Sequence, residues 1–392
     1  MIKLGKQENV FRYLRVVEEE YLRVKAEIKQ RDSGGTDMAN IKDVARQAGV
    51  SISTVSRVIN DSKSVSPSLR VMVEKAIDDL NYSTNSIARG LKSSQTNNIA
   101  VILTSVSRTF FSGVLEGINK EADQEKYSIF ISETHDSIER EIKLVRSCAS
   151  QWVDGIILAS SAYGNDMKTR KYIESLSKLE KKGSWIPVVT LEYPCSNPGV
   201  DAVVVDHKKS AFRAVDYLIR EVGKKSIVHI SLPFEHYMGQ QRIAGYREAL
   251  EQNGLLFTED NVLEGDYTSY CGYTLTRDLV RRGHPFDAVF CANDQMAVGV
   301  LQALSELEIQ VPEQVAVMGN DDIFAASIVK PSLTSIHVPR FEMGAAAMKH
   351  MLELIREGEP PVKRKIITLD TEIVERESTK RGIKNSLKYL DW

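Results

Sequence analysis

The sequence is short of the features that mark secreted and metal-dependent proteins. Its four cysteines lie far apart without a CxxC spacing, at Cys148, Cys195, Cys271 and Cys291. This pattern argues against a disulfide framework and against a zinc site. The seven histidines show no HExxH motif and no other paired ligand spacing. We therefore expect no metal and no other cofactor.

Long apolar runs and common catalytic motifs are missing as well. No run of the sequence approaches the roughly 18 apolar residues of a membrane helix. The first 30 residues are dense in charge and contain no apolar core of a secretion signal. GxGxxG, P-loop and GxSxG motifs are not found. These absences predict a cytoplasmic protein that is not an enzyme and has no membrane partner.

The charge of the chain is unevenly distributed. At 392 residues the chain is long enough for two or three domains, and its formal net charge is -2. Residues 38–95 hold eight basic and five acidic side chains, and residues 1–37 hold eight and seven, which leaves -6 for the remainder. A basic head on an acidic body is typical of a protein that binds a polyanion at one end.

Residues 1–37 form a segment of their own. Apolar residues recur there at alternating steps of four and three, at Val10, Leu14, Val17, Tyr21, Val24 and Ile28. This is the a/d pattern of a coiled coil, and it stops at the polar, glycine-containing stretch 32–37. Two interpretations stay open: a short helix that pairs two chains, or residues upstream of a natural start at Met38.

In the rest of the chain, the pattern of apolar residues changes near residue 98. Residues 38–84 read as short helices with polar turns, residues 85–97 as a polar joint, and residues 381–392 as a short basic tail. Between 98 and 380, apolar strand-like runs occur at 99–103, 127–132, 155–159, 187–191, 202–205, 226–231, 287–291 and 315–318. Helix-periodic stretches alternate with them at 111–125, 138–151, 210–222, 242–253, 269–282 and 296–307.

This alternation predicts the fold class. Strands that are apolar throughout are buried on both faces, which is typical of parallel, doubly wound sheets. So many strands over some 280 residues suit two sheets better than one. We therefore predict a small all-α head followed by an α/β domain of two doubly wound lobes, with a ligand pocket between the lobes at the carboxyl ends of the strands.

The most informative stretch is 40–60, which has the layout of a helix-turn-helix. Asn40 and Asp43 suit the start of a first helix, Gly49 suits the turn, and Ser51 suits the cap of a second helix. Val55, Val58 and Ile59 of the second helix would face inward. Its outer face would carry Ile52, Ser53, Ser56, Arg57 and Asn60.

The outer face of this second helix suits a major groove of DNA. Ile52 and Ser53 would meet base edges, and Arg57 would donate two hydrogen bonds to guanine. Phosphate oxygens would be contacted by Ser51, Thr54, Ser56 and Asn60. A third helix would start at Ser66 and Pro67 and pack through Val71, Val73, Ala76, Ile77 and Leu80. An ordinary helical hairpin is the alternative interpretation.

Short motifs recur in a fixed order along residues 39–380. They are Ile41-Lys-Asp-Val-Ala, Gly49-Val-Ser, Thr54-Val-Ser-Arg-Val-Ile-Asn, Leu80-Asn-Tyr, Asn85-x-x-Ala-Arg-x-Leu-Lys, Val153-Asp-Gly-Ile, Arg242-Ile-Ala-Gly-Tyr, Glu264-Gly-Asp, Ala292-Asn-Asp-Gln-Met-Ala-Val-Gly, Val311-Pro, Pro331-Ser-Leu-Thr-Ser and Glu375-Arg-Glu-Ser. Through them the chain resembles the LacI/GalR family of bacterial transcription regulators, and more particularly its purine-repressor and catabolite-control members.

The resemblance implies a hinge helix at 85–91. Leu91 matches the leucine that such hinges insert into the minor groove, and Asn85, Ala88 and Arg89 belong to the same DNA-contacting segment. Burial of Leu91 against the next domain is the alternative. Two heads in a homodimer imply a pseudopalindromic operator.

The resemblance also implies a periplasmic-binding-protein-like effector domain over 98–380, with three chain crossovers between its lobes. Motif matches place Arg242, Tyr267 and Asp294 in the pocket, and they suggest further members at Phe110, Phe111, Glu192, His236 and Asp321. Carboxylates accept hydrogen bonds from hydroxyls and a guanidinium donates them, which suits a polar ring. An Asp–Arg pair between the lobes without a ligand is the alternative.

Three residues depart from the pattern of the family: Glu192 where a shorter aspartate is frequent, Asn320 where an aromatic is usual, and His236. These departures prevent the ligand of any one relative from being carried over to this chain. We expect a DNA-binding repressor whose effector is a sugar or sugar phosphate, with a nucleobase or nucleoside second. A phosphorylated carrier protein as co-effector, or a purine-type corepressor, stays open. So do induction versus corepression, and dimer versus tetramer.

Overall fold

A computed structural model describes residues 39–59, 65–82, 96–150, 153–163, 166–181, 183–361 and 363–383. The chain divides into two compact units, Met1–Lys92 and Ser93–Trp392, and each is described by itself. The heptad segment 1–37, the hinge segment 85–91 and most of the tail 381–392 lie outside the described residues.

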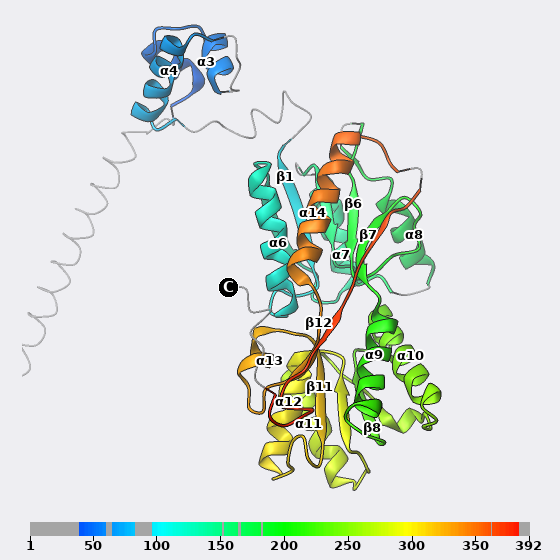
Figure 1. The fold of residues 1–392 in the computed structure, drawn as a ribbon. Helices are drawn as coiled ribbons and strands as arrows, with labels where there is room; N and C mark the ends of the chain where they lie inside the picture. The colour runs from blue at the N-terminus through cyan, green and yellow to red at the C-terminus, as the bar shows by residue number, and fades with distance from the viewer. Residues whose placement is uncertain are drawn as a thin grey trace, which may run out of the picture. The chain divides into compact units, whose positions relative to one another are not determined.

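Three short helices make up the described part of the first unit: α2 (Ile41–Gln47), α3 (Ile52–Ile59) and α4 (Pro67–Asp79). Asn40 and Asp43 form a capping box at α2, in which Asn40 Oδ1 accepts from the Lys42 amide at 2.9 Å and Asp43 Oδ2 accepts from the Asn40 amide at 3.0 Å. Gly49 turns the chain at a φ of +65°, which a residue with a Cβ adopts only with strain. The predicted helix-turn-helix is present (Figure 1).

The core of this unit is made of small side chains. Val44, Val55 and Val73 are fully buried, and Ala45, Ala48, Val58 and Ala76 fill the space between them. Small residues let the helices approach closely. One predicted packing residue is wrong: Val71 is 64% exposed, because it lies on the face of α4 opposite Val73.

The second unit holds two six-stranded sheets, one for each lobe. The sheet of lobe 1 is parallel throughout, in the order β13 (Ile366–Leu369), β7 (Asp201–Val205), β6 (Val188–Leu191), β3 (Gly155–Leu158), β1 (Asn98–Leu103) and β2 (Ser128–Glu133). The sheet of lobe 2 has the order β14 (Glu372–Val374), β12 (Thr334–His337), β11 (Ala316–Asp321), β10 (Ala288–Cys291), β8 (Ile227–Ser231) and β9 (Val262–Glu264). Its edge strand β14 is antiparallel, which the prediction of parallel sheets did not include.

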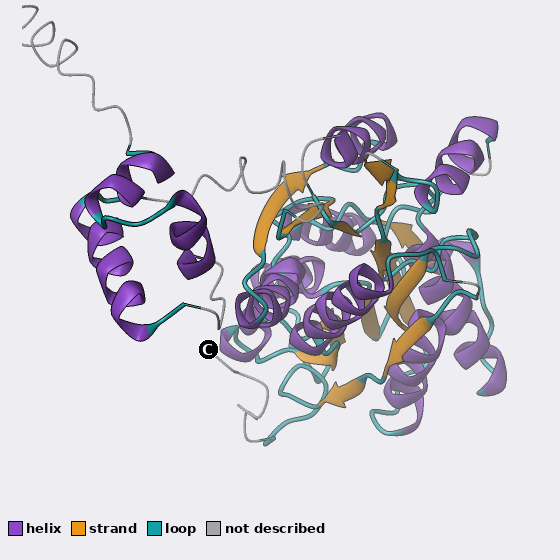
Figure 2. Ribbon diagram, turned by 90° about the horizontal axis from the view of Figure 1, so that it is seen from above, coloured by secondary structure: helices purple, strands orange, loops and turns teal. Residues whose placement is uncertain are grey.

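Helices cover the sheets on both sides (Figure 2). Lobe 1 carries α6 (Phe110–Gln124), α7 (Ile138–Ser150), α8 (Met167–Leu176) and α14 (Arg340–Glu357). Lobe 2 carries α9 (His207–Arg220), α10 (Tyr237–Gln252), α11 (Ser269–Arg281), α12 (Asp294–Glu306), α13 (Phe324–Ile328) and the 3-10 turn Glu259–Asn261. A two-stranded hairpin joins β4 (Glu180–Lys181) to β5 (Ser184–Trp185). Among the described residues, no helix has the length and apolarity to cross a bilayer.

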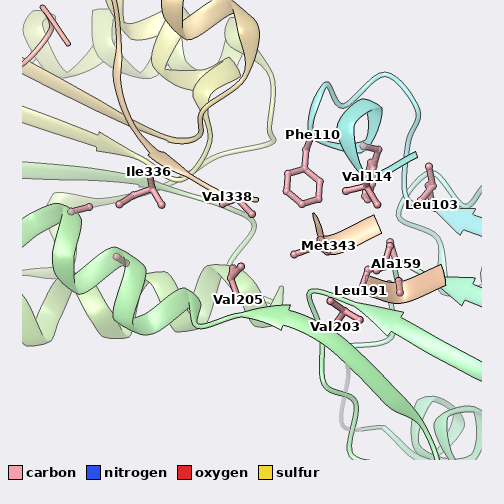
Figure 3. Close-up of a cluster of buried hydrophobic side chains, with 14 of the residues drawn as sticks. Leu103, Phe110, Val114, Ala159, Leu191, Val203, Val205, Ile336, Val338 and Met343 are labelled. Carbon is pink, nitrogen blue, oxygen red and sulfur yellow. The ribbon is translucent and has the colours of Figure 1, made fainter. Parts of the chain in front are cut away.

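The chain passes between the lobes three times: after β7, after β12 and between β13 and β14. The predicted number of crossovers is therefore confirmed. One apolar cluster runs through two of these crossings, where Val205 ends β7 and Val338 follows β12 (Figure 3). It reaches Leu103 and Leu191 in lobe 1 and Ile336 in lobe 2. The crossings are thus packed into the core of both lobes.

Candidate functional site

The outer face of α3 is short, polar and accessible. Ile52 is 45% exposed, Ser53 and Arg57 are exposed, and Ser56 is half-buried, while Val55 and Val58 point into the core. This is the division that the sequence predicts. Asn60, Asn85, Ala88, Arg89 and Leu91, which the sequence assigns to DNA contacts, lie outside the described residues.

Hydroxyl groups are linked to one another at the start of α3. Ser51 Oγ lies 2.7 Å from Ser53 Oγ and 2.9 Å from Thr54 Oγ1, and it accepts from the Thr54 amide at 3.2 Å. Ser51 therefore caps the helix, as predicted. The N-terminus of α3, with its amide groups and hydroxyls, is suited to an anion such as a phosphate.

The second candidate site is a cavity between the two lobes. It lies at the carboxyl ends of the strands in both sheets. Thr104, Ala159 and Leu191 follow or end β1, β3 and β6, and Asn293 and Asp321 follow or end β10 and β11. Ligands of doubly wound folds bind at this edge of the sheets.

Glu192 from lobe 1 and Arg242 and Asp321 from lobe 2 bring ionisable side chains into the cavity. Arg242 is buried, and one of its terminal nitrogens donates to the Ala292 carbonyl at 2.5 Å. Within the described part of the chain, Arg242 Nε and Glu192 Oε1 are buried without a hydrogen-bond partner. Leaving such groups unpaired costs about 1–3 kcal/mol each, so the two atoms point to a polar ligand.

Burial changes the protonation of these groups. It raises the pKa of Glu192 to about 7, against the opposing charge of Arg242 and with a further increase from Asp321. Burial also raises the pKa of Asp321 to about 6, again opposed by Arg242. His207 Nε2 lies 3.7 Å from Glu192 Oε1, but burial and the charge of Arg242 lower the pKa of His207 to about 3. The imidazole is thus neutral and makes no ion pair.

Three residues of the cavity lining have an unusual backbone conformation. Glu192, Tyr267 and Asp321 have φ values of +60°, +75° and +111°. Residues with a Cβ adopt positive φ values only at a cost in conformational energy, and such residues concentrate at functional sites.

Aromatic and cationic side chains join the lobes beside the cavity. The Arg108 guanidinium of lobe 1 lies 3.6 Å from the ring centre of Tyr267 in lobe 2. Tyr267 OH lies 2.6 Å from His236 Nδ1, and the His236 ring packs 4.8 Å from that of Tyr163 in lobe 1. Burial lowers the pKa of His236, which favours the neutral form of its ring. Arg108, Tyr163 and Tyr267 also line the cavity, so these contacts form part of its wall.

Most of the predicted pocket residues come together. Phe110, Phe111, Glu192, Arg242, Tyr267 and Asp321 line the cavity. His236 lies behind Tyr267. Arg242 lies in the second turn of α10 and not at its start, because α10 begins already at Tyr237.

The structure places Asp294 elsewhere. Its side chain is 0% exposed and accepts from Ser335 Oγ at 2.6 Å and from the Ile323 amide at 2.8 Å. Asp294 ties α12 to the segments after β11 and in β12, and Asp321 supplies the carboxyl of lobe 2 in the cavity. The neighbours of Asp294 in its motif, Asn293 and Gln295, do line the cavity, and so do Arg108 and Tyr163, which sequence reasoning missed.

A helix-turn-helix head followed by two lobes around a cavity defines a ligand-responsive, DNA-binding regulator. Residues 40–85 match the family described as bacterial regulatory proteins, lacI family, and residues 215–379 match the periplasmic binding protein-like domain. The chain is 33% identical over 344 residues to the HTH-type transcriptional repressor PurR of Vibrio campbellii. The aligned stretch covers 88% of this chain and 99% of that protein. The chain therefore belongs to the lacI family, as its motifs predicted.

Solved structures agree with this assignment. The lac repressor dimer bound to operator and the anti-inducer ONPF aligns with a TM-score of 0.74 and 26% identity, over 87% of this chain and 99% of that chain. The complex of the transcriptional regulator CelR with cellobiose aligns with a TM-score of 0.64 and 30% identity, over the same shares. The protein is a transcription regulator with a DNA-binding head and an effector-binding domain.

Proposed function

We propose that this protein is a repressor without enzymatic activity, and that a sugar or sugar phosphate bound between its lobes sets its affinity for an operator. The observation that carries the proposal is the pair of buried atoms without a hydrogen-bond partner among the described residues, Arg242 Nε and Glu192 Oε1. Both belong to residues of the cavity lining. A polyhydroxyl ligand supplies a hydrogen-bond acceptor for the first and a donor for the second.

The lining around these atoms suits a sugar ring. Asp321, Asn293 and Gln295 add polar groups, and Phe110 and Tyr267 present apolar ring surface. Such a combination of a few converging polar groups with aromatic walls is typical of small-molecule sites. The similarity to a regulator solved with cellobiose supports the sugar class further.

Isothermal titration calorimetry with the full chain tests this proposal. The panel is ribose, glucose, cellobiose, ribose 5-phosphate and glucose 6-phosphate, with hypoxanthine, guanine and a phosphorylated carrier protein as the alternative classes. We expect heat from at least one sugar or sugar phosphate. Arg242→Met should abolish it, whereas Arg247→Met, on the same helix but stacked on Phe257 outside the cavity, should preserve it. Binding of a purine alone, or of a phosphorylated carrier protein alone, would replace the sugar assignment.

For the head we propose that Ile52, Ser53 and Arg57 read base edges, and that phosphates are contacted by Ser51, Thr54, Ser56 and Asn60. The hinge residues Asn85, Ala88, Arg89 and Leu91 would add contacts in the minor groove. The protein would act in the cytoplasm as a homodimer on a pseudopalindromic operator, because two copies of one head require two related half-sites.

Selection of bound duplexes from random DNA tests the head. We expect Arg57→Ala to lose about 1–3 kcal/mol of discrimination between operator and random DNA. Arg46→Ala, an exposed arginine on α2 paired with Asp43, is the matched control. If Arg57→Ala kept the full preference for the selected operator, the assignment of α3 as the reading helix would be wrong.

A further inference from the structure

The carboxylate of Asp154 holds the segment at which the chain enters lobe 1. Asp154 Oδ2 accepts from the amides of Thr96 and Asn97 at 2.8 and 2.7 Å, and Oδ1 accepts from Thr96 Oγ1 at 2.8 Å. The Lys181 ammonium lies 3.2 Å from Oδ1 and also donates to the Val153 carbonyl. The Asp154 side chain is 4% exposed.

The two amide groups point at the carboxylate because of a local turn. Asn97 has a φ of +56°, so the chain bends sharply just before β1 begins at Asn98. Consecutive amides that converge on one anion form a nest. The hydrogen bonds therefore hold Thr96 and Asn97, the last two residues of the predicted hinge and linker segment 85–97, against lobe 1.

The strand after Asp154 leads directly to the cavity. β3 (Gly155–Leu158) is buried at all four positions and pairs with β1 on one side and β6 on the other. Ala159 and Ser160, at its far end, line the cavity. Ser160 Oγ donates to the buried carboxyl of Glu141 at 2.7 Å. Only four paired residues thus separate the carboxylate from the cavity wall, a span of about 13 Å at 3.3 Å per residue.

We propose that Asp154 is a positioning residue that couples the linker to lobe 1, so that a movement of lobe 1 on ligand binding in the cavity is transmitted to the linker. This inference rests on the proposed function, in which a sugar changes operator affinity. A movement of Ser160 is carried along β3 to Asp154, because a strand that is paired on both sides and buried on both faces moves as one rigid unit. The carboxylate passes it to Thr96 and Asn97, which precede β1. Asp154 itself is not part of the cavity lining.

Lobe 2 contains a matched position. Asp287 precedes β10 as Asp154 precedes β3, and its carboxylate accepts from the amides of Lys225 and Ser226 at 2.9 Å each. Those amides precede β8, the neighbour of β10. There the held segment comes from α9 of the same lobe and not from the linker. The two aspartates share a structural role, and only Asp154 holds the chain on its way from the head.

The test compares Asp154→Asn with Asp287→Asn in the full chain. An asparagine keeps the shape but directs an amide NH₂ at groups that are themselves donors. For each variant we would measure the melting temperature, the affinity for the bound sugar of the panel without DNA, and the affinity for the selected operator with and without that sugar, by fluorescence anisotropy.

In the wild type we expect the sugar to change operator affinity by about 5- to 150-fold, the usual range of allosteric coupling. In Asp154→Asn this factor should fall toward unity, while sugar affinity without DNA stays within about twofold, since the site is remote. Asp287→Asn should lower the melting temperature comparably and keep the factor. Retention of the factor in Asp154→Asn, or its equal loss in both variants, would overturn the inference.

Failure of the proposed function would give a different result: no sugar or sugar phosphate would then alter operator binding by the wild type. In that case the proposed role of Asp154 is tested by operator affinity alone. Release of the linker adds freedom that must be lost on DNA binding, so Asp154→Asn should bind the operator more weakly than Asp287→Asn. Equal operator affinities of the two variants would contradict the proposed role of Asp154 as well.

Discussion

The buried carboxyl of Glu192 should make the stability of the protein fall as the pH rises. Burial raises the pKa of Glu192 from an ordinary 4.5 to about 7. Between these values the folded chain binds more protons than the unfolded chain, so the free energy of unfolding decreases with increasing pH. A shift from 4.5 to about 7 corresponds to roughly 3 kcal/mol, of which about 2–3 kcal/mol falls between pH 5 and pH 8.

Glu192→Gln removes this titration and nearly preserves the shape. Urea unfolding of the variant should depend less on pH than that of the wild type, and the difference should appear as a gain at pH 8. Asp321, whose pKa is raised to about 6, keeps its own smaller slope in both proteins. Glu116→Gln, on the exposed side of α6, is the control. Equal pH slopes for wild type and Glu192→Gln would refute the reasoning that burial governs this carboxyl.

Three further substitutions test the packing and capping that position the sites. Asn40→Ala removes the cap of α2 and should destabilise the head by about 1 kcal/mol, seen in urea unfolding with a fluorophore on the head. Val55→Ala takes two methyl groups from a fully buried position and should cost about 2 kcal/mol by the same assay, and a change near zero would argue against the observed head core. Gly117→Ala would place a Cβ 2.0 Å from the Phe341 carbonyl oxygen, so it should separate α6 from α14 and lower the melting temperature of the effector domain, with wild-type melting as the contrary result.

The head was predictable because its signals are local. Asn40, Gly49 and Ser51 mark caps and a turn within a few residues of one another, and the structure has each where the pattern places it. The alternation of strands and helices also follows from local apolar runs, and it predicted both sheets and the interlobe cavity.

The missed elements and residues depend on contacts between distant parts of the chain. The helix α14 has buried residues on most of its faces, including Met343, Gly344 and Ala347, so its pattern shows little helical contrast. Asp294 comes after β10 and Asp321 ends β11, so both stand near the carboxyl end of a strand, and it is Asp321, with its φ of +111°, that lines the cavity. Arg108 is in the lining because it stacks on Tyr267, a partner more than 150 residues away in the sequence.

The two candidate sites lie in separate units of the chain, so control of DNA binding by a ligand requires communication between them. The most direct measurement is the affinity of the full chain for its selected operator, titrated with the sugar that binds in the calorimetric panel, for the wild type and for Arg242→Met. We expect that the sugar changes operator affinity in the wild type and has no effect in Arg242→Met, which should still bind the operator. An operator affinity that responds equally in both proteins, or in neither, would contradict this expectation.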